Sequence, residues 1–230
     1  IETIGQWVIR TACRQNKDWQ ERGFPQVPVA VNISARQFNE GHLVESILSI
    51  LEDTGMDPQF LELEITESMI MSDPERALST VSRLSALGAR LSVDDFGTGY
   101  SSLANLRKMP INELKIDRSF VSPMLRNESD LIIVRSTINL GHDLGLNVIA
   151  EGVEDSPTLD ELAVLGCDLA QGYHVSKPMP ADAFNNWLTE TAPHPAKQYS
   201  GKASQSKAAP ASATRGAVDL GGLTFAAPER

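Results

Sequence analysis

The chain has 230 residues and a mass of 25.0 kDa, the size of one large domain or of one domain with an appendage. It carries 20 basic and 30 acidic side chains, a net charge of −10, and this balance argues against a protein that binds DNA or RNA through a basic surface. No uninterrupted apolar run approaches the roughly 18 residues that span a bilayer. We therefore expect no membrane segment in this chain and, since no signal peptide is evident, a cytoplasmic protein.

Alternating strands and helices are predicted along the chain. Ile1, Ile4, Val8, Ile9 and Ala12 share one face of a helix at the start. Strands are predicted at 27–33, 60–66, 89–94, 113–117, 146–150 and 168–175, and helices at 40–54, 74–87, 128–144, 158–165 and 181–188. This α/β alternation predicts parallel strands with helical crossovers. Six or seven such units favour a TIM-like (β/α) barrel, and a doubly wound sheet is the alternative.

The end of the chain differs in composition from the rest. Residues 191–230 are rich in Ala, Ser, Pro, Gly and Thr and show no sustained periodicity, which predicts a low-complexity, disordered C-terminal tail. We therefore divide the chain into a barrel domain, residues 1–190, and a tail, residues 191–230. The domain alone holds 15 basic and 28 acidic residues, a net charge of −13, so the acidic excess belongs to the folded part.

Cysteine and histidine do not point to a metal site. Cys13 and Cys167 lie among apolar neighbours without CxxC spacing, so we expect them to fill core volume. The four histidines show no HxxxH or HExxH pairing, which argues against histidine-based metal chemistry.

Each predicted strand is followed by a polar side chain. The carboxyl ends of all strands in a β/α barrel gather on one face, so these residues are expected to converge although they are far apart in the sequence. A single acidic residue in such a position is more often a helix cap, but six strands with the same feature indicate a site. The residues are Asn32, Glu64, Asp94 with Asp95, Lys115, Glu151 and Gln171.

The gathered oxygens predict a metal centre. Clustered carboxylates raise one another's pKa unless cations neutralise them. Glu64, Asp94, Asp95, Glu151 and the Asn32 carbonyl form an all-oxygen set, which suits Mg²⁺ or Mn²⁺ better than Zn²⁺. The tandem Asp pair is able to place one carboxylate between two ions about 3.5–4 Å apart, as in metal-assisted phosphoryl hydrolysis. These residues alone leave the substrate open.

The loop after the Asp pair contains Gly97 and Gly99. It matches half of a dinucleotide-binding fingerprint, but Ser102 stands where the third glycine belongs, so we reject a Rossmann interpretation. We expect the two glycines to permit a tight, mobile loop beside the metals, with an ordinary turn as the alternative.

Six motifs resemble those of the EAL-domain family in order and spacing, over residues 1 to about 188. They are Val31-Asn32-Ile33-Ser34, Glu64-Ile65-Thr66-Glu67-Ser68, Asp94-Asp95-Phe96-Gly97-Thr98-Gly99-Tyr100-Ser101-Ser102-Leu103, Lys115-Ile116-Asp117, Ala150-Glu151-Gly152-Val153-Glu154 and Gln171-Gly172-Tyr173. The family comprises bacterial signalling phosphodiesterases that open cyclic di-GMP to linear pGpG. The resemblance therefore implies a two-metal phosphodiesterase with Mg²⁺ or Mn²⁺ as cofactor.

The resemblance also implies a role for each matching residue. Asn32, Glu64 and Asp94 resemble the ligands of a first metal ion, and Asp94, as the bridging group, Asp95 and Glu151 resemble those of a second. Lys115 resembles the lysine that activates the attacking water as a base, or orients it as a charged group.

The remaining motif residues are expected around the metals. Glu67 resembles the glutamate that holds the loop after Asp95 in its working shape. Gln171 and Asp117 are assigned to the substrate side of the site, and Glu154 to a supporting role. The charge of −13 predicts strict dependence on divalent cations, because the acidic pocket alone would repel a phosphodiester.

One departure from the family pattern bears on activity. The family is named for a Glu-Ala-Leu triplet on its first strand, whose Glu completes the first metal site, and the printed sequence does not contain this triplet. We therefore expect a barrel that is incomplete at its N-terminus, from a longer parent protein with an upstream sensory or cyclase domain, and little turnover by these 230 residues. The alternative is an inactive module that binds cyclic di-GMP or a protein partner. A homodimer is a further expectation from the resemblance.

Overall fold

A parallel sheet forms the centre of the computed structural model, which describes residues 2–99, 103–191 and 223–225. Its strands are β1 (Val29–Asn32), β2 (Leu61–Thr66), β3 (Arg90–Phe96), β4 (Glu113–Ile116), β5 (Asn147–Glu151), β6 (Leu169–Gln171) and β7 (Leu223–Phe225). They are ordered β6-β5-β4-β3-β2-β1-β7, and every neighbouring pair is parallel. Strands β1 to β6 follow one another in chain order, without the reversal of a doubly wound sheet.

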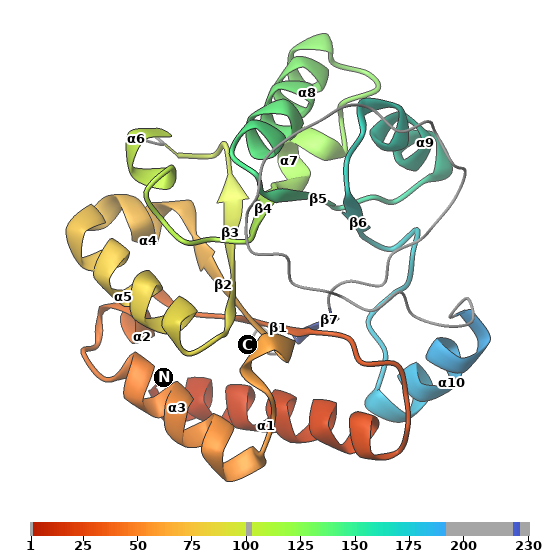
Figure 1. Ribbon diagram of the computed structural model, residues 1–230. Coiled ribbons are helices and arrows are strands. Elements are labelled where there is room, and N and C mark those ends of the chain that lie inside the picture. Colours follow the sequence, from red (N-terminus) through yellow and green to blue (C-terminus); the bar gives the residue numbers. More distant parts are fainter. Residues whose placement is uncertain (1, 100–102, 192–222, 226–230) are drawn as a thin grey trace.

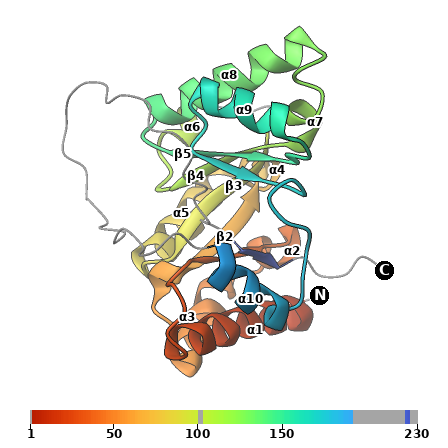
Figure 2. The ribbon, with the colours of Figure 1, turned by 90° about the vertical axis from the view of Figure 1, so that its right-hand side faces the viewer.

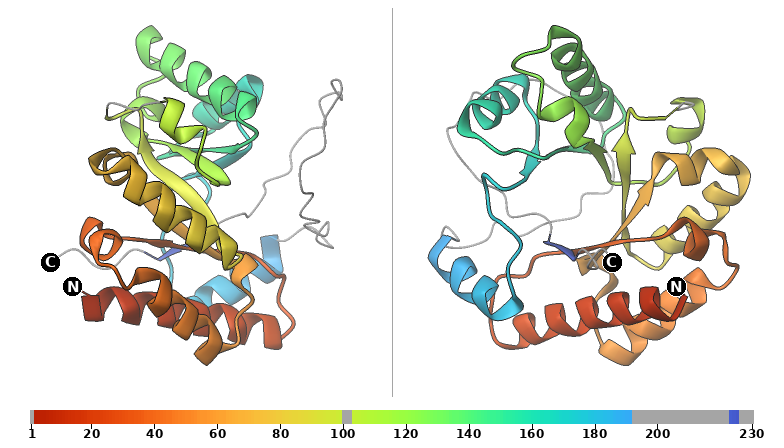
Figure 3. Two further views of the ribbon diagram at one scale, coloured as in Figure 1. Left: turned by 60° about the vertical axis from the view of Figure 1, so that its left-hand side comes forward. Right: turned by 180° about the vertical axis from the view of Figure 1, so that it is seen from behind.

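The sheet curls into an incomplete barrel with helices on its outer side. Figure 1 shows β1 to β6 arranged one after another around the centre, and Figures 2 and 3 show the helices outside the curled sheet. The expected TIM-like architecture is confirmed. Of the expected tail, only residues 191 and 223–225 lie among the described residues, and the latter form β7 beside β1.

The crossovers between strands contain helices of very different length. The long ones are α1 (Glu2–Glu21), α3 (Leu43–Thr54), α5 (Pro74–Ala86), α8 (Glu128–Asp143), α9 (Ser156–Leu165) and α10 (Ala181–Thr191). The short ones are α2 (Ala35–Asn39), η1 (Pro58–Phe60), α4 (Glu67–Ser72), α6 (Leu103–Leu106) and α7 (Arg118–Val121). The long helices agree closely with prediction, whereas the short ones were not predicted because a single turn carries too little periodicity.

Local signals explain where helices begin and end. Ser34 and Gln37 form a capping box that begins α2, and Asp155 accepts the N–H of Thr158 at the start of α9. Gly55 and Gly166 end α3 and α9 in the left-handed conformation. The helix predicted at 40–54 begins three residues later, at Leu43, because residues 40–42 form the connection from α2.

The sixth strand is shorter than predicted, since it ends at Gln171 and not at residue 175. Beyond Gln171 the chain folds over the loop that follows β5. Val153 N–H donates to the Gln171 carbonyl, and His174 N–H donates to the Val153 carbonyl, both at 3.0 Å. These bonds replace continued pairing along the sheet.

The hydrophobic core lies between the sheet and the outer helices. Alternate strand residues such as Val31, Leu63, Val93 and Leu114 pack there against the helices. A separate cluster joins the two ends of the domain, where the Trp19 ring lies 5.1 Å from that of Phe184. The opposite face of each strand is therefore left for the barrel interior.

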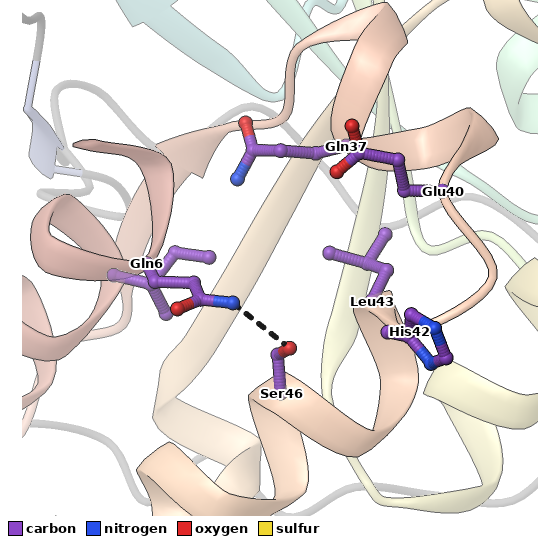
Figure 4. A pocket seen from close by; sticks show the side chains of 7 residues that line it. Gln6, Gln37, Glu40, His42, Leu43 and Ser46 are labelled. Atoms are coloured by element: carbon purple, nitrogen blue, oxygen red, sulfur yellow. Dashed lines mark hydrogen bonds between the residues drawn. The ribbon is translucent and has the colours of Figure 1, made fainter. Parts of the chain in front are cut away.

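Several sequence-based expectations concern features outside the barrel interior. Cys13 and Cys167 are free; Cys13 is fully buried, as predicted, and Cys167 is partly exposed. Among the described residues, no helix combines the length and apolar character needed to cross a bilayer. A small pocket between α1, α2 and α3 holds a hydrogen bond from Gln6 to Ser46 but none of the expected site residues (Figure 4).

Candidate active site

The carboxyl ends of five neighbouring strands bring the predicted residues together. Lys115, at 1% exposure, extends from β4 into a group of carboxylates. Its Nζ lies 2.7 Å from Glu64 Oε1, 2.5 Å from Glu151 Oε1 and 3.5 Å from Asp94 Oδ1. One ammonium therefore contacts carboxylates from β2, β3 and β5.

Strand register accounts for this convergence. Asn32 is the partner of Glu64, and Asp94 is the partner of Thr66, all on the inward-facing side of the sheet. The residues between them along the strands, such as Ile65 and Val93, are packed under the helices. The apolar alternation thus fixes which side chains reach the interior.

Two opposing effects act on the pKa values in this group. Burial disfavours the charged form of each side chain, and a neighbouring opposite charge favours it. Burial raises the pKa of Glu64 and of Glu151, and the nearby Lys115 ammonium only partly offsets it. Burial by itself lowers the pKa of Lys115, but Glu64, Glu151 and Asp94 outweigh this effect and leave it raised. The protein's own groups therefore keep Lys115 charged.

Asp95 has an unusual backbone conformation directly after Asp94. Its φ of 55° lies in the left-handed region, which non-glycine residues seldom adopt, and its N–H donates to Asp94 Oδ1 at 3.0 Å. Burial, together with the charges of Asp94 and Asp117, raises the pKa of Asp95. Strain of this kind is typical of functional sites.

Glu67 lies at the start of α4 and is 2% exposed. Its Oε2 accepts the N–H of Gly97 at 2.9 Å, so it contacts the loop that follows β3. The described part of this loop ends at Gly99, and residues 100–102 lie outside the described residues.

Gln171 and Asp117 lie at the edge of the group. Gln171 ends β6 as the register partner of Glu151. Gly172 brings the two strand ends together, because a Cβ there would lie 2.2 Å from the Val153 carbonyl oxygen. Asp117 caps α7 through the N–H of Ser119 at 2.9 Å and is near enough to Asp95 to raise its pKa.

The donor set fits hard divalent cations. Carboxylate oxygens surround the site, and Glu64 Oε2 is buried without a hydrogen-bond partner. Within the described residues, no three His, Cys, Asp or Glu side chains are already grouped as metal ligands, and the Lys115 ammonium lies between the carboxylates instead. The oxygens are therefore of the right kind, and metal binding requires them to close around the ion.

A second layer of polar side chains lies beneath this site in the barrel interior and was not predicted from the sequence. It consists of Glu62, Arg90, Ser92 and Glu113, of which all but Arg90 are at most 1% exposed. The sequence contained a signal for it: polar residues two apart in each of three strands, at 62 and 64, at 90, 92 and 94, and at 113 and 115.

Comparisons with known proteins agree with this architecture. The family model described as EAL domain matches residues 1–178. The chain is 43% identical over 182 residues to "Bifunctional diguanylate cyclase/cyclic di-GMP phosphodiesterase MucR" of Pseudomonas aeruginosa. The aligned region covers 79% of this chain and 27% of that protein. It is 40% identical over 188 residues to "Cyclic di-GMP phosphodiesterase NbdA" of the same organism, covering 82% and 24%. The chain thus spans about a quarter of these relatives' length.

Solved structures give the same result. The structure described as "PaMucR Phosphodiesterase, c-di-GMP complex" superposes with a TM-score of 0.79 at 42% identity, covering 80% of this chain and 74% of that one. The EAL domain of Mycobacterium smegmatis DcpA gives a TM-score of 0.78 at 38% identity, covering 82% and 84%. With its curled parallel sheet, its acidic strand ends and a family match over most of its length, this chain belongs to the EAL-domain family.

Proposed function

We propose that this chain provides the catalytic domain of a Mg²⁺- or Mn²⁺-dependent phosphodiesterase that hydrolyses cyclic di-GMP to linear pGpG. The observation that carries the proposal is the contact of Lys115 with Glu64, Asp94 and Glu151 at the strand ends. Relatives named as cyclic di-GMP phosphodiesterases support the choice of substrate.

The charge of the site explains why metals are needed. A phosphodiester is anionic, and four carboxylates against one ammonium would repel it. We assign Asn32, Glu64 and Asp94 to one ion, and Asp94, Asp95 and Glu151 to the other. Such ions, when bound, reverse the local sign of charge and lower the pKa of a bound water.

The chain's own groups orient the reaction. Hydrolysis forms a bond from the water oxygen to phosphorus and breaks one P–O3′ bond, and a water proton ends on the released 3′ hydroxyl. Lys115, held charged by Glu64 and Glu151, donates hydrogen bonds toward the water and the developing phosphoryl charge. Glu67 holds the adjoining loop through Gly97, and Gln171 and Asp117 border the substrate side.

A non-catalytic module that binds cyclic di-GMP or a protein partner is the second candidate. This candidate applies if the Glu-Ala-Leu triplet, which the printed sequence does not contain, is also absent from the complete gene product, because one ligand of the first ion would then be lacking. Against it stands the presence of Asn32, Glu64, Asp94, Asp95, Lys115 and Glu151 together, since a module that only binds has no chemical need of all six.

Chromatography of cyclic di-GMP incubated with Mn²⁺ separates the two candidates. Both the 230-residue chain and the complete product of its gene are assayed, each with Asp95→Asn as the inactive control. Formation of pGpG by the complete product, lost in the variant, supports the phosphodiesterase. Binding without conversion in both proteins supports the module, and absence of binding contradicts both.

The proposal extends to the cellular location, the domain organisation and the oligomeric state of the protein. Cyclic di-GMP is an intracellular messenger in this family, so a cytoplasmic location accompanies the proposal. The part of the chain that aligns makes up only about a quarter of these relatives, which supports an upstream sensory or cyclase domain in the parent protein. A homodimer is proposed from family resemblance, and sedimentation of the purified chain tests it.

A further inference from the structure

Buried side-chain oxygens without a hydrogen-bond partner lie in the polar layer and in Glu64 directly above it. Glu62 Oε2 is one of them but has the Arg90 guanidinium beside it, and three others have no such cation. Glu64 Oε2, Ser92 Oγ and Glu113 Oε2 are buried without a hydrogen-bond partner. Ser92 and Glu113 have 0% exposure and Glu64 2%, so bulk water does not reach them. A buried polar group that nothing binds is destabilising, so a ligand is expected.

These atoms come from one level of three neighbouring strands. Ser92 on β3 is the register partner of Glu64 on β2 and also of Glu113 on β4. Side chains of register partners in a parallel sheet point to the same face. This face is the barrel interior, because Leu91 and Val93 on either side of Ser92 pack in the outer core.

Glu64 and Glu113 each have one oxygen that is already paired with a cation. Glu64 Oε1 is 2.7 Å from the Lys115 ammonium, and Glu113 Oε1 is paired with the guanidinium of Arg90. The same guanidinium has its Nε 3.5 Å from Glu62 Oε2. Oε2 of Glu64 and Oε2 of Glu113 are therefore the carboxylate oxygens that still need a hydrogen-bond donor.

We propose that one internal water molecule binds between Ser92 Oγ, Glu64 Oε2 and Glu113 Oε2. Its two hydrogens match the two carboxylate acceptors, and its oxygen accepts the serine hydroxyl. Three hydrogen bonds are the usual number for a buried water. A metal ion could not accept a hydrogen bond from the hydroxyl of Ser92.

The water makes Ser92 and Glu113 positioning residues for Glu64. It ties one oxygen of Glu64 to β4, while Lys115 holds the other, and so fixes the rotamer of this carboxylate. Loss of the water is then expected to weaken metal binding. This consequence rests on the proposed function, in which Glu64 is a metal ligand. Groups that orient metal ligands typically contribute about 10- to 100-fold in affinity.

A crystal structure of the full chain at high resolution tests the site directly. The expected result is a density peak about 2.6–3.2 Å from all three atoms. Direct contact between Ser92 and either carboxylate, or empty density, overturns the proposal. So does a peak with the shorter distances and higher coordination number of a cation. This test needs no metal binding, so it stands whether or not the proposed function does.

Titration with Mn²⁺, followed by the EPR signal of the free ion, tests the consequence. Ser92→Ala and Glu113→Gln are each expected to weaken Mn²⁺ binding about 10-fold. The double variant is expected to bind no more weakly than either single variant, because both residues act through one water.

Thr137→Val is the control: it removes a buried hydroxyl from the outer helix α8 and is expected to leave the Mn²⁺ affinity unchanged. Unchanged affinity in Ser92→Ala, or additive effects, overturns the positioning role. If neither the wild-type chain nor the complete gene product binds Mn²⁺, the proposed function fails and the crystal structure alone decides on the water.

Discussion

Glu67 and Gly97 join two segments that are 30 residues apart: the carboxylate Oε2 accepts the Gly97 N–H at 2.9 Å. A Cβ placed on Gly99 would lie 3.1 Å from the other oxygen, Oε1, so the loop approaches Glu67 more closely than most side chains permit. The loop that follows Asp94 and Asp95 is thereby anchored to the start of α4.

Replacement of Glu67 by Gln weakens this anchor. The substitution keeps the size of the side chain but removes the charge that strengthens its hydrogen bond to Gly97. We expect cyclic di-GMP hydrolysis by the complete gene product to fall about 10- to 100-fold. We also expect faster hydrogen exchange at the Gly97 amide, measured by NMR.

The matched control is Glu52→Gln on the exposed face of α3, which is expected to change neither quantity. Full activity of Glu67→Gln together with slow exchange at Gly97 would contradict the anchoring role.

Replacement of Lys115 by Met leaves three carboxylates facing one another without a cation. Removal of one partner from a buried ion pair typically costs about 3–5 kcal/mol, because the other charge stays buried and unpaired. We expect the free energy of unfolding, measured with urea at pH 7.5, to fall by that amount. Mn²⁺ is expected to restore part of it, since a cation then replaces the lost ammonium.

Lys108→Met tests whether the loss of any lysine has this effect, because Lys108 is exposed on the surface. Equal stability of the Lys115 and Lys108 variants would show that the carboxylates near Lys115 are not charged together in the native protein.

The residues at the carboxyl ends of the strands, where the candidate active site lies, were predictable from the sequence. Regular alternation in each strand marked the outer core, and the residue that ends the strand marked the site. Lys115 was predicted beside the acidic residues for this reason, and it lies there. The contact of Asp117 with α7 and the short pairing of β6 were not predictable, because they depend on tertiary hydrogen bonds.

The polar layer beneath the active site was not predicted, and the reason is different. Glu62, Arg90 and Glu113 precede the family motifs along their strands, and a charged residue within a strand is usually taken to face solvent. Here all three face inward, since closure of the sheet turns the polar face of each strand to the centre. Only the register between strands shows that Arg90 lies between the two glutamates.

The two cysteines are expected to be unreactive in the native protein. Burial raises the pKa of Cys13 and of Cys167 to about 12, so neither forms appreciable thiolate at pH 8. A thiol reagent that gives a coloured product should label neither cysteine in the folded chain and both after unfolding in guanidinium. Rapid labelling of the folded chain at pH 8 would contradict the raised pKa of these two thiols.

Glu62 is expected to make the protein less stable as the pH rises. Burial, together with the charge of Glu113, raises the pKa of Glu62 from 4.5 to about 8, although Arg90 opposes the shift. Between these two values the unfolded chain loses the proton while the folded protein keeps it. The contribution of Glu62 is therefore most favourable below about pH 4.5, declines up to pH 8, and is constant above it. The slope is at most about 1.4 kcal/mol per pH unit.

Glu62→Gln removes this titration and retains the shape of the side chain. The difference in unfolding free energy between the variant and the wild type should therefore move in favour of the variant from pH 5.5 to pH 7.5, as measured with urea at several pH values. Glu52→Gln, which alters an exposed carboxylate, serves as the control and should show a constant difference. A constant difference for Glu62→Gln as well would mean that this carboxyl is ionised in the folded protein throughout, with Arg90 as a sufficient partner.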